Sequence, residues 1–249
     1  MFAATQKGWF RPTLLQITVA ANSILSISAF ATQSGQVHVY CPYKMQQFFE
    51  MFSGSISHEK PMQDWKKYLD QYDPSASLKD EIAAVRVCRL AAMAAELGTY
   101  GVGAVLLDDN GEVLAEGHNE VFVDDFRSDL HAEMVVLTKF EIEHQRPDEL
   151  GSLTLVSSLE PCPMCMTRLI YSGIRSIRYV CEDPNGGMVT RKSSLPPKIQ
   201  QISADLSQVW GLAECSRELR EAAFHIWDQN RAEIDRRIVE RGNDGTGDT

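Results

Sequence analysis

Two short motifs constrain this chain more than any other feature of its sequence. The first is His131-Ala132-Glu133, and the second, about thirty residues later, is the run Pro161-Cys162-Pro163-Met164-Cys165. Both cysteines fall on the first turn of a predicted helix, where they can supply two ligands of a tetrahedral metal site. By itself the cysteine pair is compatible with a redox pair, half of a structural zinc site or part of a catalytic zinc site. The rest of the sequence must decide among these interpretations.

Predicted strands and helices alternate around the two motifs. A hairpin is indicated by a continuous apolar run, a turn at Asp109-Asn110-Gly111 and a second short strand. In chain order, the predicted elements are a helix over 78–97, strands over 102–107 and 112–116, a helix over 131–144, a strand over 152–158, a helix over 165–173 and a strand over 174–181. This alternation predicts an α/β fold, a three-layer α/β/α sandwich around a mixed sheet of about five strands with parallel pairs.

The two helices at the ends of this pattern differ in character. In the first, apolar residues that include Ile82 and Met93 roughly follow the spacing of a helix face that packs on a core. The last predicted helix, over 216–241, holds six arginines and six carboxylates, and Glu233 lies four residues before Arg237, the spacing of a surface ion pair. The last helix is therefore predicted to be a charge-balanced surface element and not a basic arm.

The overall charge and the cysteine content narrow the class of protein. The chain has 249 residues, a formal net charge of −10 and a pI near 5.1. An acidic balance disfavours broad electrostatic capture of nucleic acid, because phosphate binding relies on clustered lysine and arginine. Six cysteines are too few for a disulfide scaffold of this length. A metal or redox role for the close pair therefore gains weight.

The N-terminal segment has the features of an export signal. Lys7 and Arg11 precede a moderately apolar run that ends in Ala29-Phe30-Ala31, which has the small-x-small form of a signal-peptidase site. Polar residues such as Gln16 and Asn22 interrupt the run, so it does not have the pattern of a membrane span. We expect an exported, periplasmic protein. The alternative is a cytoplasmic protein in which this segment forms a strand or helix of an extension.

The histidine motif can supply a third metal ligand and a free carboxylate, which the cysteine pair lacks. Zinc with three protein ligands keeps a fourth position for water, which is the arrangement of a catalytic site, whereas a structural site is closed by a fourth protein ligand. His131 and Glu133 project from one helical turn in neighbouring directions, so the imidazole can bind the metal while the carboxylate stays free. Zinc lowers the pKa of a bound water, and an adjacent carboxylate can take its proton and pass it to a leaving group. The two motifs together favour a catalytic zinc site.

The order H-x-E followed by P-C-x-x-C is the known signature of zinc-dependent deaminases. On these residues the chain resembles the cytidine-deaminase-like superfamily, and its run SLEPCPMC is most similar to the branch of guanine deaminases and tRNA adenosine deaminases. The run over 101–119 is similar to the first hairpin of that family, and the run over 171–187 to the strand and glycine-bearing loop that follow the cysteine helix. The resemblance extends from about Leu78 to near the C-terminus.

The resemblance implies a reaction and a role for each site residue. His131, Cys162 and Cys165 would hold one Zn²⁺ per chain, and Glu133 would carry protons in the hydrolytic deamination of a nucleobase. Asn119, at the end of the second hairpin strand, is similar to the asparagine whose amide contacts the base in that family. The small-molecule substrate would be a free base, a nucleoside or a nucleotide. The family commonly forms dimers, so a homodimer is expected.

The expected domains follow from the resemblance and from the N-terminal pattern. They are a signal peptide over 1–31, an N-terminal extension over 32–76, a zinc-dependent deaminase domain over 77–242 and a disordered tail over 243–249.

Two alternative functions stay open. The residues of the run SLEPCPMC favour a tRNA adenosine deaminase. The acidic net charge and the charge-balanced last helix disfavour nucleic acid as a partner. In that branch a short Asp-Pro-Thr-Ala run usually precedes the histidine, whereas FRSDL precedes it here. The other alternative, of a different class, is a catalytically silent zinc-containing partner subunit. Glu133 argues against it, because such a subunit needs no proton carrier.

Overall fold

The computed structural model describes residues 28–31, 37–40, 64–143 and 150–243. The chain divides into two compact units, Met1–Pro61 and Met62–Thr249. In the first unit, strands β1 (Ser28–Ala31) and β2 (Val37–Tyr40) pair in antiparallel fashion. The remainder of the predicted export signal, most of the predicted extension and residues 244–249 of the predicted tail lie outside the described residues. The domain boundaries expected from the sequence therefore stay predictions.

A five-stranded mixed sheet forms the centre of the second unit. Its strands are β3 (Gly103–Leu107), β4 (Val113–His118), β5 (Thr154–Leu159), β6 (Ser176–Cys181) and β7 (Val209–Leu212). Their order in the sheet is β4-β3-β5-β6-β7. β3 pairs with β4 and β5 in antiparallel fashion, whereas β5, β6 and β7 run parallel. The predicted mixed sheet is confirmed, and its fifth strand, β7, lies beyond the last strand that the sequence pattern indicates.

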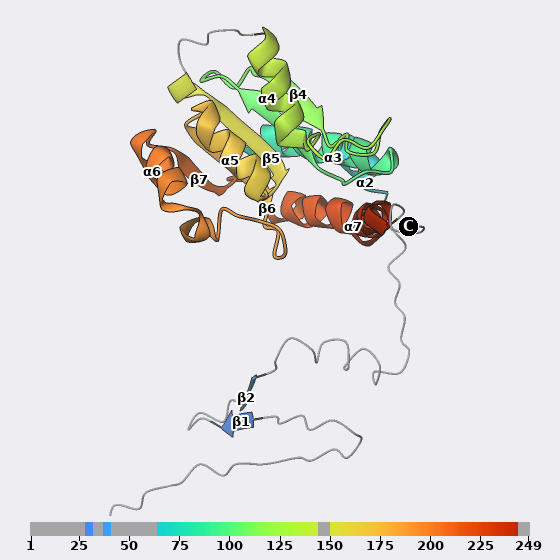
Figure 1. Ribbon diagram of the computed structural model, residues 1–249. Helices are drawn as coiled ribbons and strands as arrows, with labels where there is room; N and C mark the ends of the chain where they lie inside the picture. Colours follow the sequence, from blue (N-terminus) through green and yellow to red (C-terminus); the bar gives the residue numbers. More distant parts are fainter. Residues whose placement is uncertain (1–27, 32–36, 41–63, 144–149, 244–249) are drawn as a thin grey trace, which may run out of the picture. The chain divides into compact units, whose positions relative to one another are not determined.

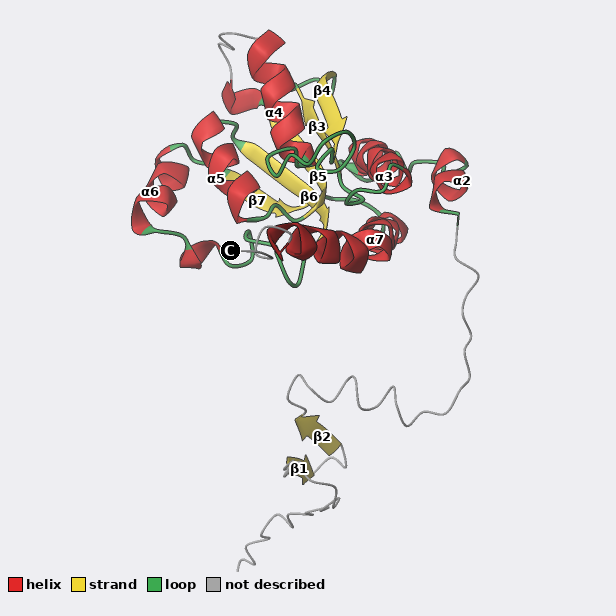
Figure 2. Ribbon diagram, turned by 45° about the vertical axis from the view of Figure 1, so that its right-hand side comes forward, coloured by secondary structure: helices red, strands yellow, loops and turns green. Residues whose placement is uncertain are grey.

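Helices cover both faces of this sheet. They are α2 (Trp65–Asp70), α3 (Glu81–Glu96), α4 (Ala132–Glu143), α5 (Pro163–Ser172), α6 (Pro197–Asp205) and α7 (Arg217–Asn243), with short 3₁₀ turns at Leu150–Ser152 and Lys192–Ser194. α4 and α5 lie side by side on one face, with α6 next to α5 (Figures 1 and 2). α3 and α7 cover the other face, and α2 packs on α3. The predicted three-layer α/β/α sandwich is confirmed.

Small side chains let α3 approach the sheet closely. Its buried face is largely alanine, and a Cβ atom added to Gly103 on β3 would lie 2.4 Å from the carbonyl oxygen of Val87. Such a distance is too short for any side chain, so glycine is required at that point of β3. Ile82 and Met93, which were expected on the packed face, are 74% and 46% exposed. The sequence prediction for these two residues is wrong because the tight contact selects alanines, not large apolar side chains.

The last helix also differs from its predicted ion pairing. Glu233 binds Arg236, three residues later, and not Arg237. Arg237 instead donates to the backbone oxygen of Gly98 at 2.8 Å, and its guanidinium lies 3.9 Å from the centre of the Phe122 ring. Arg237 therefore faces the protein, because α7 uses one side of its charged surface to contact the loops after α3 and β4.

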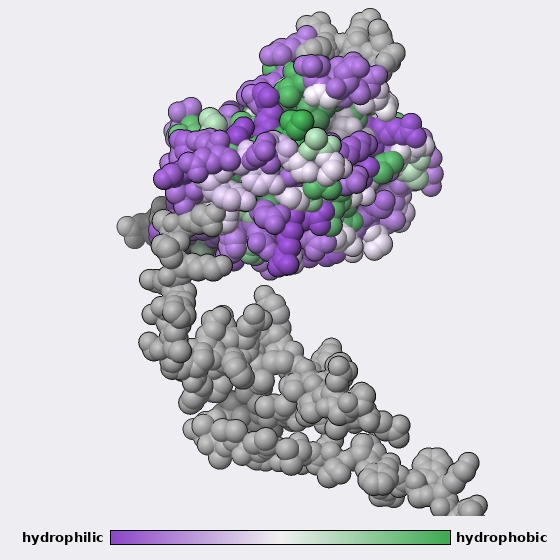
Figure 3. All heavy atoms as spheres, turned by 180° about the vertical axis from the view of Figure 1, so that it is seen from behind, coloured by the Kyte–Doolittle hydropathy of each residue, from purple (hydrophilic) through white to green (hydrophobic). Residues whose placement is uncertain are grey.

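Polar side chains dominate the face of the second unit seen in Figure 3, and apolar residues appear there in small groups. No helix in the described part of the chain has the length and apolar character needed to cross a bilayer. The sandwich buries its apolar residues between layers, with fully buried Leu106 on β3, Leu155 on β5 and Ile226 on α7.

Candidate metal centre and adjoining pocket

The histidine motif lies where α4 begins. His131 directly precedes the helix, and the backbone N–H of Val135 donates to its carbonyl oxygen at 2.9 Å. This contact is the first turn of the helix, so the imidazole stands at the N-terminal end of α4. The sequence prediction of a helix that opens at this motif agrees with the described element.

The cysteine motif occupies the corresponding end of α5. Cys162 is the N-cap residue and has an extended backbone, and Pro163 follows it in the first helical position. Proline suits that position because its φ angle is already helical and the N–H that proline lacks would have no partner in the first turn. Cys165 lies one turn further on, so both sulfurs face the same end of the helix. α5 ends at Gly173, whose φ of 81° is a left-handed cap.

Side-chain contacts hold the two motif helices together. Arg168 of α5 donates to the backbone oxygen of Met134 at 3.1 Å and to the Thr138 hydroxyl at 2.9 Å. The same guanidinium forms an ion pair with Glu141 at 2.8 Å. One arginine thus joins α5 to three successive turns of α4, and this fixes the separation of the two helix N-termini.

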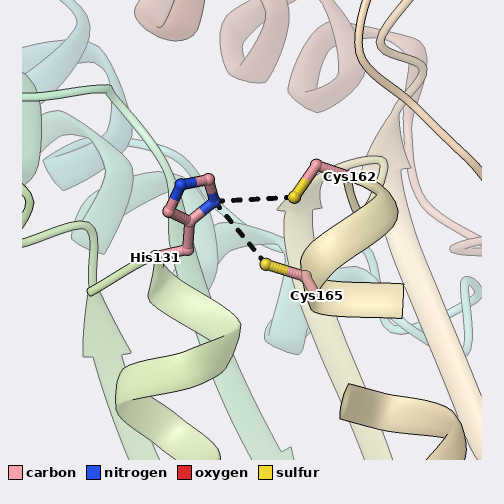
Figure 4. Close-up of side chains that lie close together, drawn as sticks. All are labelled: His131, Cys162 and Cys165. Carbon is pink, nitrogen blue, oxygen red and sulfur yellow. Dashed lines mark hydrogen bonds between the residues drawn. The ribbon is translucent and has the colours of Figure 1, made fainter. Parts of the chain in front are cut away.

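The three predicted ligands converge at these helix ends (Figure 4). His131 Nδ1 lies 3.7 Å from the Cys162 sulfur and 3.6 Å from the Cys165 sulfur, and all three ligand atoms lie within 4.8 Å of one another. Tetrahedral zinc with Zn–S bonds of about 2.3 Å and Zn–N bonds of about 2.0–2.1 Å would place nitrogen and sulfur ligands about 3.6 Å apart. The nitrogen-sulfur distances and the donor set therefore fit one Zn²⁺ ion.

The pKa values of the two thiols, Cys162 and Cys165, shift in opposite directions. Hydrogen bonding with Cys165 and with His131 lowers the pKa of the Cys162 thiol to about 4, despite its burial. The same hydrogen bond, together with burial, raises the pKa of Cys165. Burial is the largest influence on the pKa of His131 and lowers it, but the hydrogen bond to Cys162 and the nearby charges of Cys162 and Glu133 together outweigh burial, and the net shift is upward. Cys162 is therefore a thiolate at neutral pH, the form that binds metal.

Glu133 lies beside the three ligands but is not one of the group. Its side chain is buried, with 3% of the residue exposed, and it accepts a long hydrogen bond of 3.3 Å from the Ser157 hydroxyl on β5. Burial, reinforced by the nearby Cys162 sulfur, raises the pKa of this carboxyl group. A carboxyl group with a raised pKa is suited to accept and return protons near neutral pH.

Asn119 is held firmly at the end of β4. Its Oδ1 accepts hydrogen bonds from the Thr99 hydroxyl at 2.6 Å and from the Val121 backbone N–H at 3.1 Å. Because these two donors occupy the amide oxygen, the NH₂ group is the part of the side chain left for a ligand. Asn119 is 2% exposed and lines the same pocket as His131 and Glu133.

A pocket of about 410 Å³ adjoins the metal centre. The residues that line it come from both helix layers and from the loops after β4, β5 and β6. They are Tyr100, Val102, Asn119, His131, Glu133, Leu159, Glu160, Cys162, Asp183, Asn185, Gly186, Trp227, Arg231, Asp235 and Ile238. Small-molecule sites in proteins are usually concave and of a few hundred Å³. The pocket therefore has the size and the convergent polar groups of a ligand site.

One wall of the pocket belongs to α7, and the sequence analysis did not assign it to the site. Trp227, Arg231 and Asp235 lie one turn apart along this helix and all border the pocket. Their four-residue spacing marks a single helix face, but nothing in the sequence says which part of the domain that face meets. The structure brings it to the metal centre because α7 crosses the sheet beside β5 and β6.

Glu160 shapes the opposite wall. Its carboxylate accepts hydrogen bonds from the backbone N–H of Asp183 at 3.2 Å and from the backbone N–H and hydroxyl of Thr190 at 2.8 and 3.0 Å. These bonds tie the end of β5 to the loop that follows β6, which carries Asn185 and other pocket residues. The carboxylate is already engaged by these donors, so its role here is structural.

Comparisons with known proteins agree with this site. The family model of the cytidine and deoxycytidylate deaminase zinc-binding region matches residues 78–181. A tRNA-specific adenosine deaminase of Bacillus subtilis is 35% identical over 109 residues, which are 44% of this chain and 66% of that protein. A tRNA(Ile)-lysidine synthase of Deinococcus radiodurans is 36% identical over 106 residues, 43% of this chain and 18% of that protein. The chain thus spans about two thirds of the first of these relatives and less than a fifth of the second.

Among solved structures, a guanine deaminase from Nitrosomonas europaea is 19% identical, with a TM-score of 0.49 over 68% of this chain and 93% of that one. The matched segment of the family model contains the hairpin, both motif helices and all three atoms of the metal centre. Through residues 78–181, the chain belongs to the cytidine-deaminase-like superfamily.

Proposed function

We propose that this protein is a zinc-dependent hydrolytic deaminase that converts an amino-bearing nucleobase to its oxo form. The reaction takes one water and releases one ammonia. The observation that carries the proposal is the arrangement at the pocket, where a thiolate-imidazole metal centre and the buried carboxyl group of Glu133 stand side by side. A structural zinc site would require a fourth protein ligand and no free carboxylate.

His131, Cys162 and Cys165 would hold the zinc ion. When bound, zinc supplies Lewis-acid chemistry that makes water a nucleophile near neutral pH. Glu133 takes the proton of the attacking water on its carboxylate and delivers it to the ring nitrogen next to the reacting carbon. The same carboxylate then takes the second proton of that water, from the hydroxyl now bonded to the ring carbon, and passes it to the departing amino group, so that ammonia leaves and the ring carbon keeps the oxygen as a carbonyl. The raised pKa of Glu133 favours both transfers.

Asn119 would orient the base. Thr99 and Val121 fix its amide oxygen, so its NH₂ group can donate to an oxygen or a ring nitrogen of the substrate. Trp227, which is 5% exposed and lines the pocket, excludes water from the same region. Together these residues would hold a flat heterocycle with its amino-bearing carbon towards the metal.

A tRNA adenosine deaminase is the second candidate. Three relatives described as tRNA-specific adenosine deaminases, from Bacillus subtilis, Haemophilus influenzae and Agrobacterium fabrum, are 35%, 36% and 31% identical over about a hundred residues. Against it stand the formal charge of −10 and the ion pairs within α7, which leave few cations for phosphates.

The test is ammonia release from purified, zinc-loaded protein. The panel contains guanine, cytosine, adenosine, cytidine, their deoxy and 5′-phosphorylated forms, and a tRNA anticodon stem-loop. We expect turnover of at least one of the small molecules, and loss of that turnover on treatment with a chelator. Turnover confined to the stem-loop, with a steep decline of binding as salt rises, would favour the second candidate.

The control separates a missing substrate from a missing activity. Zinc content is measured on the same samples as ammonia release. A protein that holds one zinc ion and releases ammonia from no member of the panel would contradict the proposal, and it would favour the catalytically silent partner subunit instead.

A further inference from the structure

The α7 wall of the pocket carries one cation. Arg231 is the single lysine or arginine among the pocket-lining residues that the structure describes. It lies on the same face of α7 as Trp227, and its guanidinium carbon is 5.2 Å from the centre of that ring. A guanidinium at this position, near a metal centre and over an aromatic ring, has the features of a phosphate or carboxylate ligand.

Two carboxylates form ion pairs with the Arg231 guanidinium. Asp228 accepts from Arg231 at 3.1 Å, and Asp235 lies 3.7 Å from its other terminal nitrogen. Asp228 does not line the pocket, whereas Asp235 does. Asp235 is itself oriented by the hydroxyl of Tyr100, which donates to it at 2.6 Å. The cation is therefore neutralised from inside the pocket by a carboxylate that a second element of the fold holds in place.

The other charged groups around the pocket are acidic. Glu133, Glu160 and Asp183 lie at the ends of three different elements and present carboxylates or a carboxyl group to its lining. The charges of two thiolates and one Zn²⁺ ion would cancel, so the metal centre adds no excess positive charge. A phosphate that entered this pocket would meet like charges and no unpaired cation among the described lining residues.

We propose that Asp235 is a specificity-determining residue, which neutralises Arg231 and so restricts the pocket to phosphate-free substrates, that is, free bases or nucleosides. The inference rests on the proposed deaminase function for the identity of the substrate. It goes further by excluding 5′-nucleotides and RNA as preferred substrates. Its physical basis is repulsion of an anion, and not a steric limit, so a single change of charge should alter it.

The decisive variant is Asp235→Asn. Asparagine keeps an oxygen that accepts from Tyr100 but removes the negative charge beside Arg231. We expect the wild-type protein to prefer the base or nucleoside over the matching 5′-monophosphate by about tenfold or more in kcat/KM. In Asp235→Asn this preference should fall by about tenfold. The double variant Asp235→Asn/Arg231→Gln should regain the wild-type preference, because it also removes Arg231, whose remaining partner Asp228 lies outside the pocket lining.

Glu233→Gln is the matched control. It makes the same change of charge on the same helix, two residues away, but Glu233 pairs with Arg236 and does not line the pocket. Its substrate preference should equal that of the wild type. If Glu233→Gln lowered the preference as much as Asp235→Asn, the effect would come from the net charge of the chain, and the role assigned to Asp235 would be wrong.

A binding measurement keeps the test independent of turnover. Inorganic phosphate is added to each zinc-loaded protein, and the shift of the thermal midpoint is recorded. We expect phosphate to stabilise Asp235→Asn more than the wild type, Glu233→Gln or the double variant. Equal shifts in all four proteins would overturn the inference even if no substrate had been found. A wild-type protein that preferred the monophosphate or the stem-loop would also overturn it, while the proposed deaminase function would stand.

Discussion

Two buried glutamates in this domain have opposite surroundings. Glu81, in the first turn of α3, is fully buried and accepts hydrogen bonds from the Tyr72 hydroxyl at 2.6 Å and from the Ser216 backbone N–H at 2.7 Å. Glu133, in the first turn of α4, is almost as buried but receives a weak 3.3 Å contact from Ser157 and borders the pocket. Both are acidic residues at a helix N-terminus, where the helix dipole favours them.

The two surroundings indicate a structural role for Glu81 and a chemical role for Glu133. Glu81 joins the segment before α3 to the start of α7, so its donors are part of the architecture. Glu133 has weaker donors, the Ser157 hydroxyl at 3.3 Å and the Cys165 thiol, and its pKa is raised by burial and by the Cys162 sulfur. A carboxyl group that borders a pocket and has a raised pKa can exchange protons with a ligand. The comparison therefore predicts that one residue controls stability and the other controls turnover.

The largest expected effect is that of Glu133→Gln. Loss of the proton carrier should lower kcat by about 10²–10⁴-fold. The zinc content should stay at the wild-type level, because Glu133 is not one of the three converging ligands. Stability should not fall, since an uncharged amide costs less to bury than a carboxylate with few donors. Kinetics and metal analysis of the same preparation provide the measurement, and near-normal activity would disprove the assigned role.

Glu81→Ala should produce the complementary result. The change leaves the Ser216 backbone N–H without its acceptor and the Tyr72 hydroxyl with only the Ser216 hydroxyl as a partner, and the free energy of unfolding should fall by about 2–4 kcal/mol. Activity per folded molecule should stay within about twofold of the wild type, because Glu81 does not line the pocket. Urea unfolding and kinetics at low temperature measure the two quantities. A variant that kept its stability but lost kcat would reverse the comparison.

An intermediate effect is expected for Thr99→Val, which removes the donor that orients Asn119. KM should rise by about tenfold, with a smaller change in kcat, because the base is held less well while the proton carrier is untouched. Thr99→Ser keeps the hydroxyl and should restore KM. If valine and serine had equal effects, the contribution of Thr99 would be packing and not the hydrogen bond to Asn119.

The smallest effect is that of Tyr72→Phe, and it depends on pH. Burial, and next the hydrogen bond to Glu81, raise the pKa of Tyr72 to about 12. Because the folded-state pKa is above the ordinary value of about 10, the stabilisation is complete below pH ~10 and is lost as the pH rises towards ~12. The variant should be about 1 kcal/mol less stable at neutral pH. The difference from the wild type should shrink between pH 10 and 12, as measured by urea unfolding at each pH.

Local patterns predicted much of the fold. The turn at Asp109-Asn110-Gly111 and the apolar runs on either side indicated the hairpin that β3 and β4 form. The pattern predicted a helix over 165–173, close to the observed α5 of Pro163–Ser172, which ends at Gly173. These signals succeed because caps and turns depend on residues that are neighbours in the chain. The buried face of α3 was predicted poorly, since the residues that fit it depend on how closely a distant strand approaches.

The sequence by itself determined the chemistry of the metal centre. Two motifs, each at the start of a helix, contain the imidazole, the thiols and the carboxylate, and their residue types carry the signal without any knowledge of distances. Only the tertiary structure decided what surrounds that chemistry. Arg168 sets the separation of the two helices, Thr99 orients Asn119, and Asp235 neutralises Arg231 in the pocket wall. The first two contacts join residues that are far apart in the sequence, and the third matters because α7 packs beside the metal centre. The strength of each contact depends on distances in the folded protein, which no local sequence pattern encodes.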